Sequence, residues 1–197
     1  MGTDEFWNII ATARANTTGR RPFDVALADV LAERPPAEIL AYAEAFATAR
    51  SDLERWDVWA AAYLIGGGCS DDSFMDFRAG VISLGREWYE RVLAHPDSLA
   101  GHPQLIAGEE YFFHEAVNYA AAGAFRRVTD GSEDFYAAWD RYRAAAGLGR
   151  RTIDMGEDFD FDDDEEMRRR LPRLFALLED EDEDEQDEED EAGGTEG

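Results

Sequence analysis

Residues 56–90 read WDVWAAAYLIGGGCSDDSFMDFRAGVISLGREWYE, and the rest of the chain is interpreted around this stretch. It holds three consecutive glycines, the only cysteine, a pair of aspartates and two arginines among aromatic residues. The spacing of its apolar residues predicts one helix from about Leu53 to Ile65 and a second from about Ser73 to Leu93. Glycine adopts positive φ angles freely, so the glycines at 66–68 end the first helix. The stretch therefore predicts two helices joined by a glycine turn.

Each of these two helices carries one charged residue on its apolar face. At about 100° per residue, Asp57 falls between Leu53 and Leu64, and Arg78 falls within the stripe that contains Phe74. An unpaired charge on such a face costs several kcal/mol. We therefore predict that Asp57 and Arg78 are in contact, directly or through one intermediary. A buried salt bridge that fixes the angle between the helices is the preferred interpretation. The alternatives are a charge pair that binds a ligand and exposure of the two charges through local bending.

The residues after the glycines admit several kinds of chemistry. Ser70, Asp71 and Asp72 can each cap the following helix, and this is the preferred interpretation because their charge suits a helix N-terminus. The two aspartates are alternatively candidates for a divalent cation or for acid/base work. Cys69 precedes a helix N-terminus, where a thiolate is stabilised, but no histidine is near in sequence to act as its base. We expect Cys69 to be a small residue buried in a tight turn.

A third interpretation is that the amides of the glycine turn, with Arg78 or Arg86, receive an anion. The neighbouring aspartates argue against phosphate unless a metal bridges the charges. The candidate binding or structural site consists of Asp57, Gly67, Gly68, Cys69, Ser70, Asp71, Asp72, Arg78 and Arg86. We assign no catalytic residue, no metal site and no cofactor.

The remaining chain also has helical periodicity. Further helices are expected over residues 6–15, 23–33, 37–50, 109–127 and 135–146, with a loop at 95–105 and a short amphipathic helix within 167–179. The sequence predicts an all-α fold of about seven helices in one domain spanning residues 1–178. Residues 179–197 are almost entirely acidic and polar, and we expect them to be a disordered tail.

Composition excludes several classes of function. The formal net charge is −26, which disfavours nucleic acid and anionic membranes and favours a basic protein partner. One cysteine permits neither an internal disulfide nor a Cys-x-x-Cys metal motif, and three scattered histidines have no metal-ligand spacing. No apolar run reaches the roughly 20 residues of a membrane span, so we expect a soluble cytoplasmic protein. The oligomeric state is left open.

The central stretch carries a resemblance to a known family. The pattern W-D-x-W-A-A-A-Y-L-I-x-G-G-C-S-D-D-x-F-x-x-F-R, followed by I-S-x-G-R-E and P-D-S-L-A, resembles the bacterial family known as domain of unknown function 4240. The resemblance covers residues 5 to about 120, and residues 159–178 also resemble the family's C-terminal end. The motif positions are Trp56, Asp57, Trp59, Gly67, Gly68, Cys69, Ser70, Asp71, Asp72, Phe74, Phe77, Arg78, Gly85, Arg86 and Glu87.

The resemblance implies a helical fold with its site at these positions, but it implies no activity. One departure is Gly80, which stands where the family pattern leads us to expect an aromatic residue, so a packing contact or pocket wall is expected to be missing there.

Two classes of function follow. The first is a non-enzymatic binding or regulatory protein, such as an immunity protein, with a basic partner. The second is a small enzyme or ligand-binding domain that uses Gly67 to Asp72 with Arg78 and Arg86. A concave pocket shared by Cys69, the two aspartates and an arginine would favour the second class, whereas mutual capping and pairing would favour the first.

Overall fold

The computed structural model describes residues 1–107, 112–149 and 151–179, and within these ranges the predicted all-α fold is confirmed. The only extended pairing in these ranges is an isolated bridge between Thr18 and Arg21. None of the helices described is long and apolar enough to cross a membrane. The helices are α1 (Thr3–Ala15), α2 (Phe23–Ala32), α3 (Pro36–Asp52), α4 (Trp56–Gly66), α5 (Asp71–Ser83), α6 (Arg86–Ala94), η1 (Pro96–Gly101), α7 (Pro103–Ile106), η2 (Glu115–Tyr119), α8 (Ala120–Val128), α9 (Phe135–Ala145) and α10 (Asp164–Arg170).

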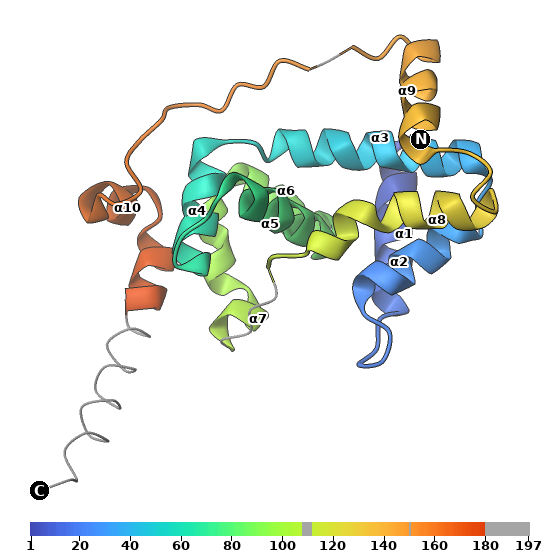
Figure 1. The fold of residues 1–197 in the computed structure, drawn as a ribbon. Helices are drawn as coiled ribbons and strands as arrows, with labels where there is room; N and C mark the ends of the chain where they lie inside the picture. Colours follow the sequence, from blue (N-terminus) through green and yellow to red (C-terminus); the bar gives the residue numbers. More distant parts are fainter. Residues whose placement is uncertain (108–111, 150, 180–197) are drawn as a thin grey trace, which may run out of the picture.

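The core lies where α1, α2, α3 and α8 pack against one another (Figure 1). These helices form where apolar residues recur every three or four positions, and that spacing turns their apolar faces inward. Ile10, Leu27, Ile39 and Ala124 are completely buried at this junction. The next layer is formed by α4, α5 and α6, which carry the central stretch of the sequence and lie toward the opposite end of α3 (Figure 1).

The predicted single helix over residues 73–93 is wrong, because Gly85 divides it into α5 and α6. Gly85 has φ +92° and ψ 174°, which is incompatible with continuation of a helix and is readily adopted only by glycine. The side chain of Arg14 lies against this glycine, with Cδ 3.6 Å from the position that a Cβ would take. The break redirects the chain, so Arg86 leaves the axis of α5.

The predicted helix over residues 109–127 is also wrong in its first half. Residues 108–111 lie outside the described part of the chain, residues 112–114 are not helical, η2 follows, and the α-helix begins only at Ala120. The amide of His114 donates to the carbonyl of Asp76 on α5 at 3.1 Å. A Cβ on Gly80 would lie 1.9 Å from the carbonyl oxygen of Phe112. Because Gly80 has no side chain, the backbone of Phe112 can lie against α5 at this position, where the family pattern led us to expect an aromatic residue.

The C-terminal part of the described chain returns to α4. Residues 151–163, here called the C-terminal strap, run from the end of α9 across to α4 and into α10 (Figure 1). The carbonyl of Met155 accepts the amide of Trp56 at 2.9 Å, and the ring of Phe161 lies 6.1 Å from Trp56 and 5.5 Å from Tyr63. Backbone and aromatic contacts thus fix the strap on α4.

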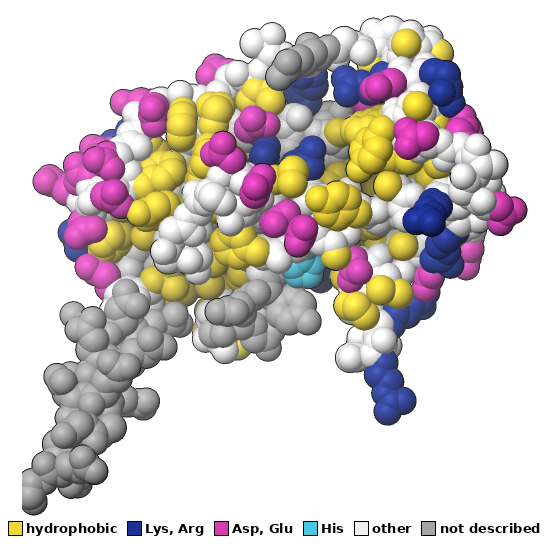
Figure 2. Space-filling view, viewed as in Figure 1, with side chains coloured by type: hydrophobic (Ala, Val, Ile, Leu, Met, Phe, Trp, Pro, Cys, Tyr) yellow, Lys and Arg dark blue, Asp and Glu magenta, His cyan; other side chains and the backbone are white. Residues whose placement is uncertain are grey.

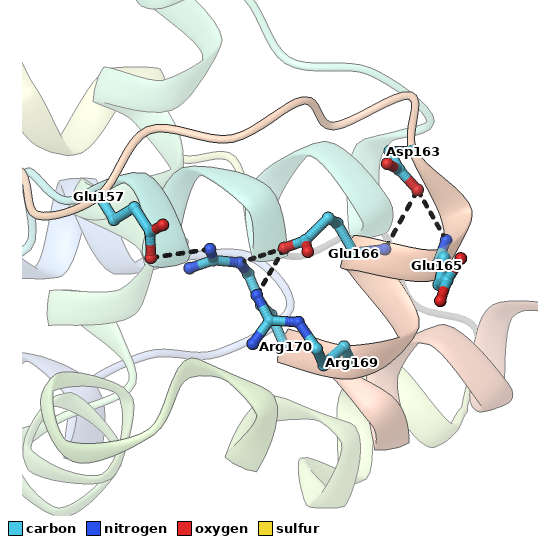
Figure 3. A network of polar contacts seen from close by, with 6 residues as sticks. All are labelled: Glu157, Asp163, Glu165, Glu166, Arg169 and Arg170. Carbon is cyan, nitrogen blue, oxygen red and sulfur yellow. Dashed lines mark hydrogen bonds and ion pairs between the residues drawn. The ribbon is translucent and has the colours of Figure 1, made fainter.

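An ion-pair network joins the strap to α10 (Figure 3). Arg170 donates to Glu157 of the strap at 3.0 Å and to Glu166 at 2.9 Å, and Arg169 donates to Glu166 at 2.6 Å. These hydrogen bonds lower the pKa of Glu166 to about 2. Asp163 caps α10 by accepting from the amides of Glu165 and Glu166. The network holds the strap and α10 as one unit.

The short helix predicted within residues 167–179 is instead two helical pieces. One is α10, and the other spans residues 172–179, beginning at Pro172. Leu174 and Phe175 are buried as predicted, and Asp97 accepts the amides of Arg173 and Leu174 at 3.0 and 2.9 Å. Glu179, the first residue of the predicted disordered tail, is helical and pairs with Arg168, while residues 180–197 lie outside the described residues.

Candidate functional site

The glycine turn forms as predicted, and the glycines serve its backbone angles. Gly67 is left-handed at φ 59°, and Gly68, at φ 127°, donates to the carbonyl of Tyr63 at 2.8 Å. No other group lies within 4 Å of the position that a Cβ would take on either residue. Gly66 differs, because its Cβ would lie 2.9 Å from the ring of Phe113. Gly67 and Gly68 are therefore required by the reversal of the chain and not by the close approach of another element.

The residues after the glycines cap the next helix. Ser70 is the N-cap of α5, and its hydroxyl accepts the amide of Ser73 at 3.2 Å. Asp71 and Asp72 are exposed in the first turn, where a negative charge is favourable. The carbonyl of Cys69 accepts the indole N–H of Trp59 at 3.0 Å. The capping interpretation is confirmed for Ser70, and the Trp59 bond fixes the turn against α4.

The thiol of Cys69 is partly buried and is not activated. Burial raises its pKa to about 11, and the favourable effects of Trp59 and Arg78 are smaller than this cost of desolvation. A nucleophilic cysteine needs the opposite shift. Cys69 therefore has the character of a structural residue.

We expect alkylation of Cys69 by iodoacetamide to be about a hundredfold slower at pH 8 than that of a thiol of ordinary pKa, because the rate follows the thiolate fraction. The measurement is the pH dependence of the alkylation rate by mass spectrometry, which should keep rising to about pH 11. The same chain unfolded in urea is the control and should react at the ordinary rate. An inflection near pH 9 or below in the folded protein would contradict the raised pKa.

The predicted contact between Asp57 and Arg78 is wrong, because each has another partner. Arg78 is 8% exposed, and its guanidinium donates to the carboxylate of Glu54 at 2.8 Å. Asp57, in the first turn of α4, pairs with Arg55, the N-cap residue of that helix. The error arose from the start of the helix: α4 begins at Trp56, and Leu53 is the C-cap of α3. The helical projection drawn from Leu53 therefore misplaced Asp57.

Arg78 connects three segments. Besides Glu54, it donates to the carbonyl of Arg50 at the end of α3 and to the carbonyl of Phe74 on its own helix, both at 3.3 Å. Its guanidinium carbon lies 4.5 Å from the centroid of the Phe74 ring. These contacts join α5 to the segment between α3 and α4. They leave few N–H groups of the guanidinium available to a ligand.

An aromatic stack, which the sequence analysis did not identify, extends from Arg78. Phe74 stacks on Trp59 with centroids 4.6 Å apart, and Trp59 stacks on Trp56 at 5.5 Å. Phe161 of the strap meets the far end of the stack. The two tryptophans are three residues apart on a helix, which was the available signal for a shared face. Phe161 gave no such signal, because it lies about a hundred residues from the two tryptophans in the sequence.

The structure does not bring Arg86 to the turn. Arg86 is the first residue of α6, is exposed, and pairs with Asp4 of α1 at 2.9 Å and with Glu90 at 2.7 Å. The cavity beside the turn, about 470 Å³, is lined by Ile65, Gly66, Gly68, Ser73, Asp76, Phe112 and Phe113. Cys69, Asp71, Asp72 and Arg78 are not among its lining residues. The predicted site thus separates into a capped turn, a buried structural arginine and a surface ion pair.

A larger groove, missed by the sequence analysis, lies between α1, α3, α6 and α9. Its volume is about 610 Å³, and it lies beside the N-terminus where α9 meets α3 (Figure 1). Glu44, Asp52 and Glu90 line it together with Trp7, Tyr89 and Tyr142. Two of its carboxylates already hold arginines of the same chain: Arg143 lies 3.5 Å from Glu44, and Arg151 lies 2.7 Å from Asp52. We call this the acidic groove.

The surface beyond the groove is also acidic. Exposed carboxylates gather at the end of the molecule formed by the strap and α10 (Figure 2). The exposed acidic residues of this end are Asp154, Glu157, Asp158, Asp160, Asp162, Asp163, Asp164 and Glu165. Within the described residues, no group of three or more His, Cys, Asp or Glu side chains could hold a metal ion.

Comparison with known proteins identifies the family but gives no activity. No curated protein and no solved structure shows significant similarity to the chain. The family described as protein of unknown function (DUF4240) matches residues 1–127, so the match does not extend to residues 159–178, where the sequence also suggested it. Because the matched part is well over half of the sequence, the chain belongs to the DUF4240 family.

Proposed function

We propose that this protein is a non-enzymatic binding protein, regulatory or immunity-like in type, whose acidic groove receives an arginine-bearing segment of a basic protein. The observation that carries the proposal is that two carboxylates lining the groove already pair with arginines of the same chain. Arg143 pairs with Glu44 and Arg151 pairs with Asp52, so these carboxylates already bind guanidinium groups.

The groove has the chemistry that such a segment requires. Carboxylates accept charge-assisted hydrogen bonds from guanidinium, and aromatic rings pack against the planar group and its aliphatic stem. Glu44 is partly buried, with 19% of its side chain exposed, and it also accepts the indole N–H of Trp139 at 3.0 Å. Tyr89 and Trp7 stand beside one another in the groove with centroids 4.9 Å apart. Fixed carboxylates beside rings favour arginine over a lysine of the same charge.

The central turn supports the non-enzymatic class. Ser70 caps α5, Arg78 is held by Glu54, and the Cys69 thiol has a raised pKa, so these groups are committed to the structure. The net charge of −26 would accelerate encounter with a basic partner and make the association sensitive to salt.

The experiment is a titration with a fluorescently labelled deca-arginine peptide, followed by fluorescence anisotropy. The variant Glu44→Gln/Asp52→Asn removes two groove charges and should weaken binding about tenfold or more relative to its control. The matched control is Asp130→Asn/Asp140→Asn, which removes two exposed carboxylates that do not line the groove. Equal weakening by both double variants would show general charge attraction only and would contradict the groove as the site.

The chain's own arginines allow a second test, in which the affinity for the peptide is expected to rise. Replacing Arg143 and Arg151 with glutamine frees Glu44 and Asp52, so the peptide should bind more tightly than to the parent protein. The control is Arg126→Gln/Arg141→Gln, which also removes two positive charges but none that lines the groove or pairs within it. If the substitutions at Arg143 and Arg151 tighten binding no more than the control substitutions do, the proposal is contradicted.

A further inference from the structure

A separate cavity of about 410 Å³ lies between α1, α2, α5, α6 and α7. Its walls include Phe23, Leu84 and Trp88, and its polar groups include Arg14, Ser83 and His102. None of its lining residues is acidic, although the chain has 45 Asp and Glu residues. Each of the other cavities described above contains at least one carboxylate. This cavity therefore differs in charge from those cavities.

Arg14 supplies the positive charge. Its Nη1 donates to the carbonyl of Ser83 at 2.6 Å, and no carboxylate in the described residues pairs with it. Arg14 is exposed as a residue, and partial desolvation of its guanidinium lowers the pKa of that group. Most other arginines in the described chain are paired with carboxylates, as expected where acids are in excess. The remaining N–H groups of Arg14 are available to an anion.

His102 supplies a second donor. It is 5% exposed and is held between the rings of Trp88 and Phe112, with centroids 4.6 and 5.3 Å away. Its Nδ1 accepts the amide of Gln104 at 3.2 Å, so in the neutral ring the proton lies on Nε2. Burial and the charge of Arg14 lower the pKa of His102, which keeps it neutral at pH 7. Among the described residues, no hydrogen bond from this Nε2–H is present, so it is free to donate to a ligand.

We propose that this cavity binds a small monocarboxylate with an apolar body. Arg14 and the Nε2–H of His102 receive the carboxylate, and Phe23, Leu84 and Trp88 contact the body. Arg14 is the one arginine among the described lining residues, and its single positive charge matches a monoanion. A dianion such as a phosphate monoester would remain half uncompensated inside a protein of net charge −26.

The experiment is a calorimetric titration with benzoate, compared with benzyl alcohol and with inorganic phosphate. We expect one saturable site in the range of about 0.1–10 mM, with benzyl alcohol about tenfold weaker or more. Arg14→Gln should weaken benzoate about tenfold or more, whereas Arg126→Gln, an exposed arginine outside the cavity, should change it less than twofold. Absence of saturable binding, or equal binding to Arg14→Gln, would overturn the proposal. Phosphate binding as tight as benzoate would overturn it too, by showing a general anion site.

Nuclear magnetic resonance of the unmodified protein keeps the test decisive if Arg14→Gln does not fold. Benzoate should shift the imidazole signals of His102 and the indole signal of Trp88, assigned with a Trp88→Phe variant. Benzoate binding that leaves both sets of signals unmoved would place the ligand elsewhere and overturn the proposal. This test is independent of the acidic groove, so either proposal can fail while the other stands.

Discussion

A Gly80→Ala variant is expected to lose about 3 kcal/mol of unfolding free energy, the upper part of the range for overpacking. The added Cβ would lie 1.9 Å from the carbonyl oxygen of Phe112 and 2.7 Å from its carbonyl carbon. These atoms are backbone, and the amide of His114, two residues on, is bonded to Asp76, so the segment cannot rotate aside as a side chain can. The loss exceeds the gain of up to about 1 kcal/mol that alanine brings to a helix.

Gly123 is the matched control for this prediction. It also lies within a helix, α8, but nothing lies within 4 Å of the position that its Cβ would take. Gly123→Ala should therefore stabilise the protein by about 0.4–1 kcal/mol. Urea unfolding followed by circular dichroism measures both changes. If Gly80→Ala proved as stable as Gly123→Ala, the Phe112 backbone could not lie on α5 as described.

The second large effect is expected at Arg78. An Arg78→Met variant keeps much of the side-chain volume but removes the charge, leaving Glu54 and the carbonyl of Arg50 without their donor. Breaking a buried pair from one side costs about 3–5 kcal/mol. The Glu54 side chain is 34% exposed and can regain water, so we expect a loss of about 2–4 kcal/mol.

Asp57→Asn is the comparison for Arg78→Met. Asp57 pairs with Arg55 near the surface, where an ion pair contributes about 1 kcal/mol or less. The two variants should therefore differ by at least about 1 kcal/mol in urea unfolding. Equal losses at both positions would favour a shared ion pair between Asp57 and Arg78, as the sequence alone suggested. A loss below about 1 kcal/mol for Arg78→Met would show that the buried pair contributes little to stability.

Features with a local cause were predictable from the sequence. Helical periodicity located most of the helices, and the run of glycines located the turn after α4. Of the three residues that were expected to be able to cap the helix after the glycines, Ser70 is the N-cap. The motif around Trp56 to Arg78 correctly indicated the family. Each of these signals lies within a few residues of the structure that it predicts.

Features that depend on contacts between distant segments were not predictable. The break at Gly85 looked like a continuing helix because apolar spacing persists on both sides of it. Phe112 and Phe113 looked helical for the same reason, but their backbone packs on α5, where Gly80 leaves room. Arg78 was correctly placed in the core, but its partner could not be chosen between Glu54 and Asp57 without knowing where α4 begins.

The structure does not bring all of the candidate site residues together, and the reason is related. Arg86 is close to the turn in sequence, but it lies at the start of α6 and pairs with Asp4 of α1. Conversely, the acidic groove and the cavity at His102 collect residues from helices far apart in the chain. No local pattern connects Glu44 to Arg143 or Arg14 to Ser83.

The strap has a practical consequence for anyone who produces this protein or its relatives. The family match stops at residue 127. Two contacts nevertheless depend on residues after that point: the ring of Phe161 packs against Trp56 of α4, and the amide of Arg173 donates to the carboxylate of Asp97. A gene fragment cut at the family boundary would remove the contacts of Phe161 with Trp56 and Trp59, exposing more of the two indoles to water and inviting aggregation during expression. The sensible cloning limit therefore falls after residue 179, once the returning segment has been included.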